Sequence, residues 1–243
     1  MCCRSKEQSN TNMMKKVSST QQFHRKVGIM GGTFNPIHYG HLLMAERAFE
    51  DFALDEVCFI PTGLQWMKKG SPDLIAGDVR YEMTAMAIEG RGGFGISRME
   101  IDRQGNTYTY ETMQDLKKQQ PDTEFYYILG ADTLAKMDQW MHPEIVFDSA
   151  VILCAVREGE FLLPDQSSVA LHEKASDNED AGGLQQIILH LKEKYQADIR
   201  LLSMPRMDIS STAIRNRIKE GKSVRYLLPD AVIDYIRQNQ LYL

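Results

Sequence analysis

The sequence predicts an α/β fold in which a parallel sheet is flanked by helices and followed by C-terminal helices. Short apolar segments suited to buried strands recur along the chain, and helical patterns separate most of them. This alternation is typical of parallel strands, because each crossover must run back along the sheet before the next strand begins. The predicted strands are residues 26–30, 57–60, 94–101, 125–129, 150–156 and 199–202.

The turn and helix signals follow the strands in order. Gly31-Gly32 ends the first strand, and a helix with one apolar face comes next. A further helix is expected at about residues 184–194. The apolar face of the first helix is formed by Leu42, Ala45, Phe49 and Phe52.

The C-terminal part predicts two more helices. Ser210 is a suitable N-cap for a helix over residues 211–220, and Gly221 suits the position after its end. Pro229 can begin the last helix, because a proline at the first turn loses no intrahelical hydrogen bond. The apolar residues of that helix are Val232, Ile233 and Ile236.

The size and composition are those of one ordinary globular domain. The chain has 243 residues, of which 43% are hydrophobic and 25% charged, so it can bury one substantial core. We expect a single domain over residues 26–243. Residues 1–25 are polar and predict a disordered tail or an expression remnant. Residues 158–183, rich in Glu, Asp, Ser and Gly, predict a polar surface excursion.

Charge and cysteine content narrow the function classes. A net charge of -5 gives no general attraction to nucleic acid or to an anionic membrane, so a small anion is the expected partner. No apolar segment reaches the roughly 20 residues that span a bilayer. Cys58 and Cys154 lie in apolar segments, where a buried reduced thiol is usual, and this indicates a cytoplasmic protein. The sequence leaves open whether the chain forms a homo-oligomer.

A first candidate site lies between the first strand and the first helix. It reads Gly31-Gly32-Thr33-Phe34-Asn35-Pro36-Ile37-His38-Tyr39-Gly40-His41. Backbone N–H groups of such a turn can converge on an anion. His38 and His41 can project to the same side, donate to one phosphate and, if protonated, add positive charge. The alternatives are a turn-capping His38 beside a surface His41, or a metal-binding pair; the glycine-rich entry favours phosphate.

A second candidate site is Ile209-Ser210-Ser211-Thr212-Ala213-Ile214-Arg215. The start of a helix offers N–H groups without intrahelical acceptors, and Arg215 lies one turn after Ser211, leaning back toward them. Such a start can hold a polyphosphate. Taken without the first segment, the two serines are also explained by an ordinary helix N-cap. Together with the first segment, it would hold an anion from two sides.

These two segments, in this order at the two ends of an alternating chain, resemble bacterial nicotinate-nucleotide adenylyltransferase. Both stand intact, and the resemblance covers residues 26–243. The sequence is also similar to that family at four shorter places: Tyr108-Thr109, Gly130-Ala131-Asp132, Trp140 and Tyr226-Leu227-Leu228-Pro229.

The resemblance implies a Rossmann-like nucleotidyltransferase fold and an enzyme of NAD biosynthesis. Its substrates would be ATP and nicotinic acid mononucleotide, and its products nicotinic acid adenine dinucleotide (deamido-NAD) and pyrophosphate. His38, His41 and Arg215 would be the catalytic residues, and no metal cage is evident, so Mg²⁺ should arrive with ATP. The expected phosphate-binding residues are Gly31, Gly32, Thr33, Phe34, Lys68, Ile209, Ser210 and Ser211.

The resemblance also assigns the two nucleoside halves. Gly130 and Asp132 would bind a ribose, and Asp132 follows a predicted strand, where open α/β sheets bind ligands; its alternative role is a helix N-cap. Tyr108, Thr109 and Trp140 would bind the nicotinate. Thr109 can cap the following helix, whose free N–H groups and positive end suit a carboxylate better than a carboxamide.

One segment departs from the family pattern. The family usually shows Pro-Pro-His before a basic residue, whereas this chain has Gln65-Trp66-Met67 before Lys68. Methionine neither donates a hydrogen bond nor carries charge, so we expect Lys68 to supply the missing phosphate contact.

Two alternative functions stay open for the whole protein. One is an adenylyltransferase for nicotinamide mononucleotide or another acceptor such as a phosphopantetheine, and the other is a non-catalytic nucleotide sensor.

Overall fold

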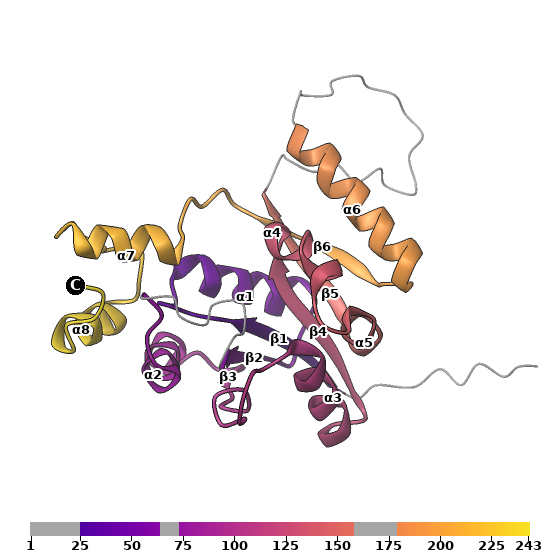
Figure 1. The fold of residues 1–243 in the computed structure, drawn as a ribbon, viewed down its shortest axis with the longest axis horizontal. Helices are drawn as coiled ribbons and strands as arrows, with labels where there is room; N and C mark the ends of the chain where they lie inside the picture. Colours follow the sequence, from indigo (N-terminus) through magenta and orange to yellow (C-terminus); the bar gives the residue numbers. More distant parts are fainter. Residues whose placement is uncertain (1–24, 64–72, 158–178) are drawn as a thin grey trace, which may run out of the picture.

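The computed structural model describes residues 25–63, 73–157 and 179–243. Within these ranges the strands form a six-stranded parallel sheet in the order β3-β2-β1-β4-β5-β6, which confirms the predicted fold class (Figure 1). The strands are β1 (Arg25–Gly32), β2 (Glu56–Pro61), β3 (Phe94–Ile96), β4 (Thr123–Gly130), β5 (Val151–Arg157) and β6 (Ile199–Met204).

Helices cover both faces of this sheet. The side chains of β4 alternate between two hydrophobic cores: Tyr126 and Ile128 join one, and Phe125, Tyr127 and Leu129 the other. Residues of α1, α2, α7 and α8 pack in the first core, and residues of α3, α5 and α6 in the second. The helices are α1 (Tyr39–Asp51), α2 (Gly77–Ile88), α3 (Thr109–Gln119), α4 (Ala131–Leu134), the 3₁₀ helix η2 (Met137–Gln139), α5 (Pro143–Ser149), α6 (Glu179–Tyr195), α7 (Ser211–Lys219) and α8 (Asp230–Gln238).

The strand order reverses between β1 and β4. From β1 the chain proceeds outward through β2 and β3, and then returns to β4, which pairs with the other side of β1. Open α/β sheets bind ligands beyond the carboxyl ends of the strands at such a reversal. The ends of β1 and β4 are therefore the expected location of a site.

Two predicted elements differ from the structure. The strand predicted over residues 94–101 ends at Ile96, and a turn follows in which the Asp102 N–H donates to the Arg98 carbonyl. The Arg98 side chain pairs there with Asp78 and Asp102. The helix predicted at about residue 184 already begins at Glu179. Glycines within this helix hide its start, since glycine is a poor helix former.

The C-terminal helix signals are confirmed. The Ser210 hydroxyl accepts a hydrogen bond from the Ala213 N–H at 3.2 Å, as an N-cap does. Gly221 follows α7 with a φ of +67°, the left-handed conformation that ends many helices. Pro229 immediately precedes α8.

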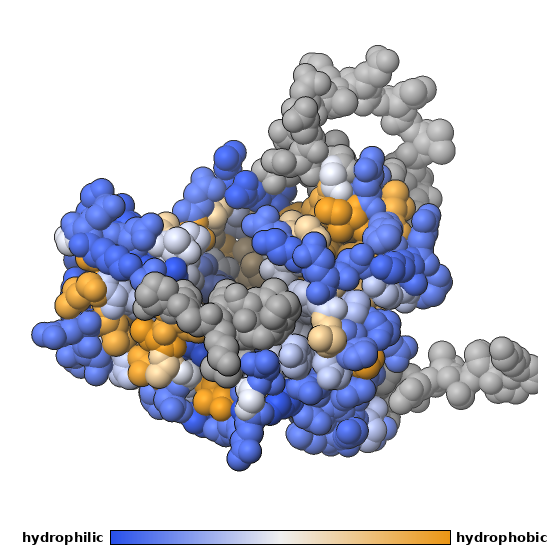
Figure 2. All heavy atoms as spheres, in the orientation of Figure 1, coloured by the Kyte–Doolittle hydropathy of each residue, from blue (hydrophilic) through white to orange (hydrophobic). Residues whose placement is uncertain are grey.

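The burial of the cysteines and the polarity of the surface are those of an ordinary globular domain. Cys154 is fully buried and Cys58 half-buried, and burial raises the pKa of both thiols to about 12. Figure 2 shows a mainly hydrophilic face on which the hydrophobic areas are separated from one another. Among the described residues, no helix has the length and apolar character needed to cross a membrane. The expectations for residues 1–24, 65–69 and 158–178 lie outside the described ranges.

Candidate active site

A cavity of about 710 Å³ opens at the carboxyl ends of the central strands, where the strand order reverses. Residues from both candidate segments line it, together with residues that follow β4. The predicted site residues along its wall are Gly31, Gly32, Thr33, Phe34, His38, His41, Thr109, Gly130, Asp132, Trp140, Ile209, Ser211 and Arg215.

Three predicted site residues are not among the lining residues. Ser210 is exposed, and its hydroxyl caps α7. Tyr108 occupies the N-cap position of α3, and its ring lies beside that of Tyr110, with centroids 5.9 Å apart. Lys68 lies outside the described residues.

The turn after β1 is held in a demanding conformation. Phe34 has a φ of +47°, which is uncommon for a residue with a side chain, and it is only 2% exposed. Its ring packs edge-on against His41, with centroids 5.1 Å apart. At Gly31, a Cβ atom would lie 2.5 Å from the Tyr127 hydroxyl, so only glycine fits the floor of the cavity without a shift.

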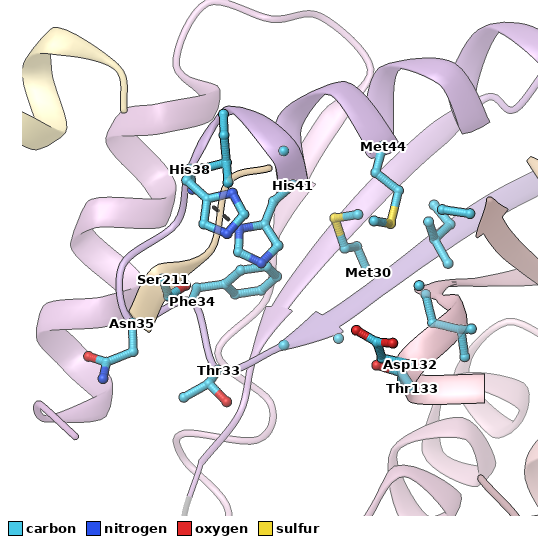
Figure 3. A pocket seen from close by; sticks show the side chains of 18 of the residues that line it. Met30, Thr33, Phe34, Asn35, His38, His41, Met44, Asp132, Thr133 and Ser211 are labelled. Atoms are coloured by element: carbon cyan, nitrogen blue, oxygen red, sulfur yellow. Dashed lines mark hydrogen bonds between the residues drawn. The ribbon is translucent and has the colours of Figure 1, made fainter. Parts of the chain in front are cut away.

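His38 and His41 lie side by side above Phe34 (Figure 3). Their rings stack with centroids 3.7 Å apart, and the His38 backbone N–H donates to His41 Nδ1 at 3.2 Å. With Nδ1 accepting, the neutral His41 ring carries its proton on Nε2 and can donate from there. His41 is half-buried and lines the cavity, so the alternative of a surface helix residue is wrong. His38 does occupy the N-cap of α1.

Burial keeps both rings neutral in the free protein. It lowers the pKa of His38 to about 4, and it lowers the pKa of His41 well below the usual range, with a further contribution from His38. The condition for a positive charge, protonation of the rings, is therefore not met near neutral pH in the free protein. Neutral imidazoles can still donate N–H groups to an anion.

Arg215 and Ser211 join the second segment to the first. Arg215 donates from Nη1 to the Asn35 carbonyl at 3.0 Å, and the Ser211 hydroxyl donates to the Pro36 carbonyl at 2.9 Å. These contacts bring residues about 180 positions apart in the sequence to one wall of the cavity. The Arg215 guanidinium brings a positive charge to this wall; its side chain is 14% exposed, and Asp73 Oδ2 lies 4.0 Å from its Nε.

The opposite wall follows β4. Asp132 lies in the first turn of α4, whose N-cap is Gly130, so the alternative role of Asp132 as an N-cap is wrong. Figure 3 shows Asp132 and Thr133 across the cavity from the two histidines. An exposed carboxylate here can accept hydrogen bonds from the hydroxyls of a ribose.

A third group lies where α3 begins. Thr109 is the first helical residue and not the cap, because Tyr108 keeps an extended backbone (φ -128°, ψ 140°). The first-turn N–H groups still lack intrahelical acceptors, so the expected preference for a carboxylate is unchanged. Trp140 lines the same cavity and meets Tyr127 edge-on, with ring centroids 6.2 Å apart.

Sequence reasoning missed several residues of the cavity wall. Tyr127 reads as an ordinary strand residue, and Glu100 falls in a segment expected to be a strand. Glu100 is buried and accepts a hydrogen bond from the Thr112 hydroxyl at 2.8 Å; burial raises the pKa of its carboxyl group. Asn35 belongs to the first candidate segment, but no sequence signal indicated that its side chain lines a site. Across the described part of the chain, no three His, Cys, Asp or Glu side chains gather as metal ligands would.

Comparison with known proteins gives the family of this chain. Residues 29–217 match the cytidylyltransferase-like family model, which defines the chain as a nucleotidyltransferase by class. Among its relatives, the probable nicotinate-nucleotide adenylyltransferase of Lachnoclostridium phytofermentans is 44% identical over 90% of this chain and 100% of its own length. That of Corynebacterium glutamicum is 38% identical over 93% of this chain and 92% of its own. The chain belongs to the nicotinate-nucleotide adenylyltransferase family.

Solved structures confirm the nucleotidyltransferase fold. Plasmodium falciparum nicotinic acid mononucleotide adenylyltransferase, in its complex with NaAD, superposes with a TM-score of 0.67 over 90% of this chain and 98% of that chain. The same protein in complex with APC gives 0.65. Both are 19% identical to this chain, so the likeness concerns the fold alone.

Proposed function

We propose that this protein transfers the AMP part of ATP to nicotinic acid mononucleotide, giving nicotinic acid adenine dinucleotide and pyrophosphate in cytoplasmic NAD biosynthesis. One observation carries the proposal: both phosphate-type segments, the start of α3 and Trp140 line one cavity. The family of the closely matching bacterial relatives supports the same reaction. Neither a nucleic acid nor a membrane is required as a partner.

The reaction needs no covalent intermediate with the protein. A phosphate oxygen of the mononucleotide attacks the α-phosphorus of ATP, a new P–O bond forms, and the bond to the β-phosphate breaks to release pyrophosphate. The phosphate is largely dianionic near neutral pH and attacks without a protein base. The protein must align the reactants and stabilise charge as it develops.

The assigned roles follow the walls of the cavity. Neutral His38 and His41 donate N–H groups to the ATP phosphates from the side of α1. Arg215 supplies positive charge from α7, and Asp132 accepts from a ribose. The two neutral imidazoles suit a phosphate chain. They can stabilise the negative charge that develops during transfer, and they place no buried positive charge of their own in the free enzyme.

Mg²⁺ is expected to accompany ATP. It takes most of its ligands from phosphate oxygens and water when no protein cage is present. The cavity fits such a delivered ion, because Asp132 is an exposed carboxylate among its lining residues and carboxylate oxygen is a ligand that Mg²⁺ accepts. When bound, the ion neutralises phosphate charge.

The acceptor preference follows from the start of α3. Its free N–H groups pair with the carboxylate of the acid mononucleotide, whereas the carboxamide turns N–H donors toward them and leaves donors unpaired. An unpaired buried donor costs roughly 1–3 kcal/mol. We therefore expect the acid to be preferred by at least about tenfold in kcat/KM.

Pyrophosphate release tests the proposal directly. The purified protein is incubated with ATP, Mg²⁺ and either the acid mononucleotide, the amide mononucleotide or a phosphopantetheine. Equal rates with acid and amide contradict the assigned acceptor, and no release with any acceptor favours a nucleotide sensor. Trp140→Ala is the matched control: it should weaken both mononucleotides alike, since stacking is indifferent to the group on the ring.

A further inference from the structure

Arg80 is a buried arginine that the proposed reaction does not yet use. It lies in the first turn of α2 and is 2% exposed. Its guanidinium donates to three backbone carbonyls: Ile75 at 3.1 Å, Thr33 at 2.6 Å and Thr62 at 2.6 Å. Thr33 follows β1 and Thr62 follows β2, and both line the cavity.

Arg80 combines burial with acceptors that are all neutral. Arg91 and Arg98 are examples of arginines whose guanidinium groups pair with carboxylates. Within the described residues, Arg80 forms no ion pair, and all three of its acceptors are neutral. Burying a cation this way costs free energy that a well-packed apolar side chain would not. A role in placing these carbonyls explains why a guanidinium stands there.

The direction of the Thr33 carbonyl also sets the direction of the Phe34 N–H. The peptide bond between Thr33 and Phe34 is trans, so its carbonyl and its N–H point in opposite directions. Since the Thr33 carbonyl faces Arg80, the Phe34 N–H faces away from it. Phe34 lines the cavity, and its N–H has no hydrogen-bond acceptor among the described residues. The positive φ of Phe34 belongs to the same turn.

We propose that Arg80 is a positioning residue for adenylyl transfer, and that it directs the Phe34 N–H to a phosphate of the bound nucleotide by holding the Thr33 carbonyl. This inference rests on the proposed function. The planar guanidinium reaches three carbonyls through separate N–H groups in fixed directions. A lysine ammonium keeps the charge but is a point donor, so it cannot hold the same three carbonyls.

The test separates position from charge and from stability. Arg80→Lys and Arg80→Met are compared with the parent in steady-state kinetics, varying ATP and the mononucleotide in turn. Both variants should raise the KM for ATP or lower kcat by about tenfold or more, while the KM for the mononucleotide changes less than about threefold. A role in stability alone would lower the unfolding midpoint and leave both KM values unchanged.

A matched control is Arg91→Lys. Arg91 donates two hydrogen bonds to Glu46 and lies over Phe49 and Phe94, away from the cavity. This variant should keep the parent kinetics. If Arg80→Lys also retains the parent KM for ATP and kcat, or raises both KM values equally, the proposal is wrong. If the parent itself transfers no AMP, the proposed function fails instead.

A second measurement needs no variant, in case Arg80 substitutions prevent folding. Inorganic pyrophosphate is titrated into the isotope-labelled parent, and backbone amide resonances are followed by NMR. The Phe34 amide should shift with the same saturation curve as the side-chain resonances of His38 and His41. If both histidines respond and the Phe34 amide does not, its N–H is not a phosphate ligand, and the proposal is overturned.

Discussion

The two histidines of the cavity are buried and can still donate N–H groups. In the proposed function, His38 and His41 bring their N–H groups to one phosphate from a buried position, yet burial disfavours charged imidazole. The stacked rings, 3.7 Å apart, resolve this by remaining neutral, with the pKa of His38 lowered to about 4. A bound polyphosphate supplies negative charge that favours protonation, so proton uptake can accompany nucleotide binding.

Removing either imidazole should damage the chemical step more than substrate binding. We expect His38→Ala and His41→Ala each to lower kcat by about a hundredfold or more, because lost charge stabilisation appears mainly in the transition state. The KM for the mononucleotide should change less. Steady-state kinetics, with circular dichroism as the control for folding, measures both. Near-normal turnover in a folded variant would contradict the role given to that histidine.

The same lowered pKa predicts how stability depends on pH. Unfolded His38 takes up a proton near pH 6.5, whereas folded His38 takes it up near pH 4. The unfolded state therefore binds more protons between these values, and the free energy of unfolding falls as pH falls from 6.5 toward 4. The slope is at most ~1.4 kcal/mol per pH unit for each histidine. Urea unfolding of the parent and of His38→Asn at several pH values tests this; an identical slope would contradict it.

At the scale of elements, three helix starts meet at one cavity. His38 precedes α1, Thr109 begins α3 and Ser211 begins α7, and all three residues line the cavity. Each start contributes N–H groups without intrahelical acceptors and the positive end of a helix dipole. The cavity thus offers N–H donors to an anion although the chain has a net charge of -5.

Ser210 allows the capping of α7 to be separated from phosphate binding. Its hydroxyl accepts from the Ala213 N–H and does not line the cavity. Ser210→Ala should therefore cost about 1 kcal/mol of unfolding free energy, whereas Ser210→Gly should cost only a few tenths. Urea unfolding measures both, and kcat should stay near the parent value. A large loss of activity in a stable Ser210→Gly variant would instead favour a phosphate contact.

The sequence predicted what local signals specify. The Ser210 cap, Gly221 and the two glycines that end β1 are signals that act within a few residues, and the structure places them as expected. The end of β3 differs from the prediction because residues 97–101 alternate like a strand, whereas in the structure they form a turn whose Arg98 pairs with the distant Asp78. The role of Arg80 depends on carbonyls that only folding brings together.

For the whole molecule, the two halves of the site come from distant parts of the chain. Arg215 and Asn35 are 180 positions apart, and the strand reversal between β1 and β4 brings the lining segments together. The site therefore exists only in the native state. A ligand that contacts both segments binds the folded chain and not the unfolded one.

Ligand binding should accordingly stabilise the entire domain. At a concentration about 100 times its Kd, pyrophosphate or the dinucleotide product should raise the unfolding free energy by roughly 2.7 kcal/mol. Urea unfolding at increasing ligand concentration measures the effect. The Arg215→Ala variant should show a smaller gain at the same concentration. A gain unaffected by this change would mean that the ligand binds without the second segment.

Tyr242 connects the C-terminal part of the chain to the turn after β1. Its buried hydroxyl donates to Asn35 Oδ1 at 2.8 Å, across 207 positions of sequence, and the Asn35 amide donates in turn to the Asp73 carbonyl. A nascent chain can form β1 and α1 early, since N-terminal parts leave the ribosome first. The turn that carries Phe34 is also held by Arg80 and Arg215, and the Tyr242 contact comes from furthest along the sequence. This turn thus gains its contact to Tyr242 later in synthesis than residues 25–51 emerge.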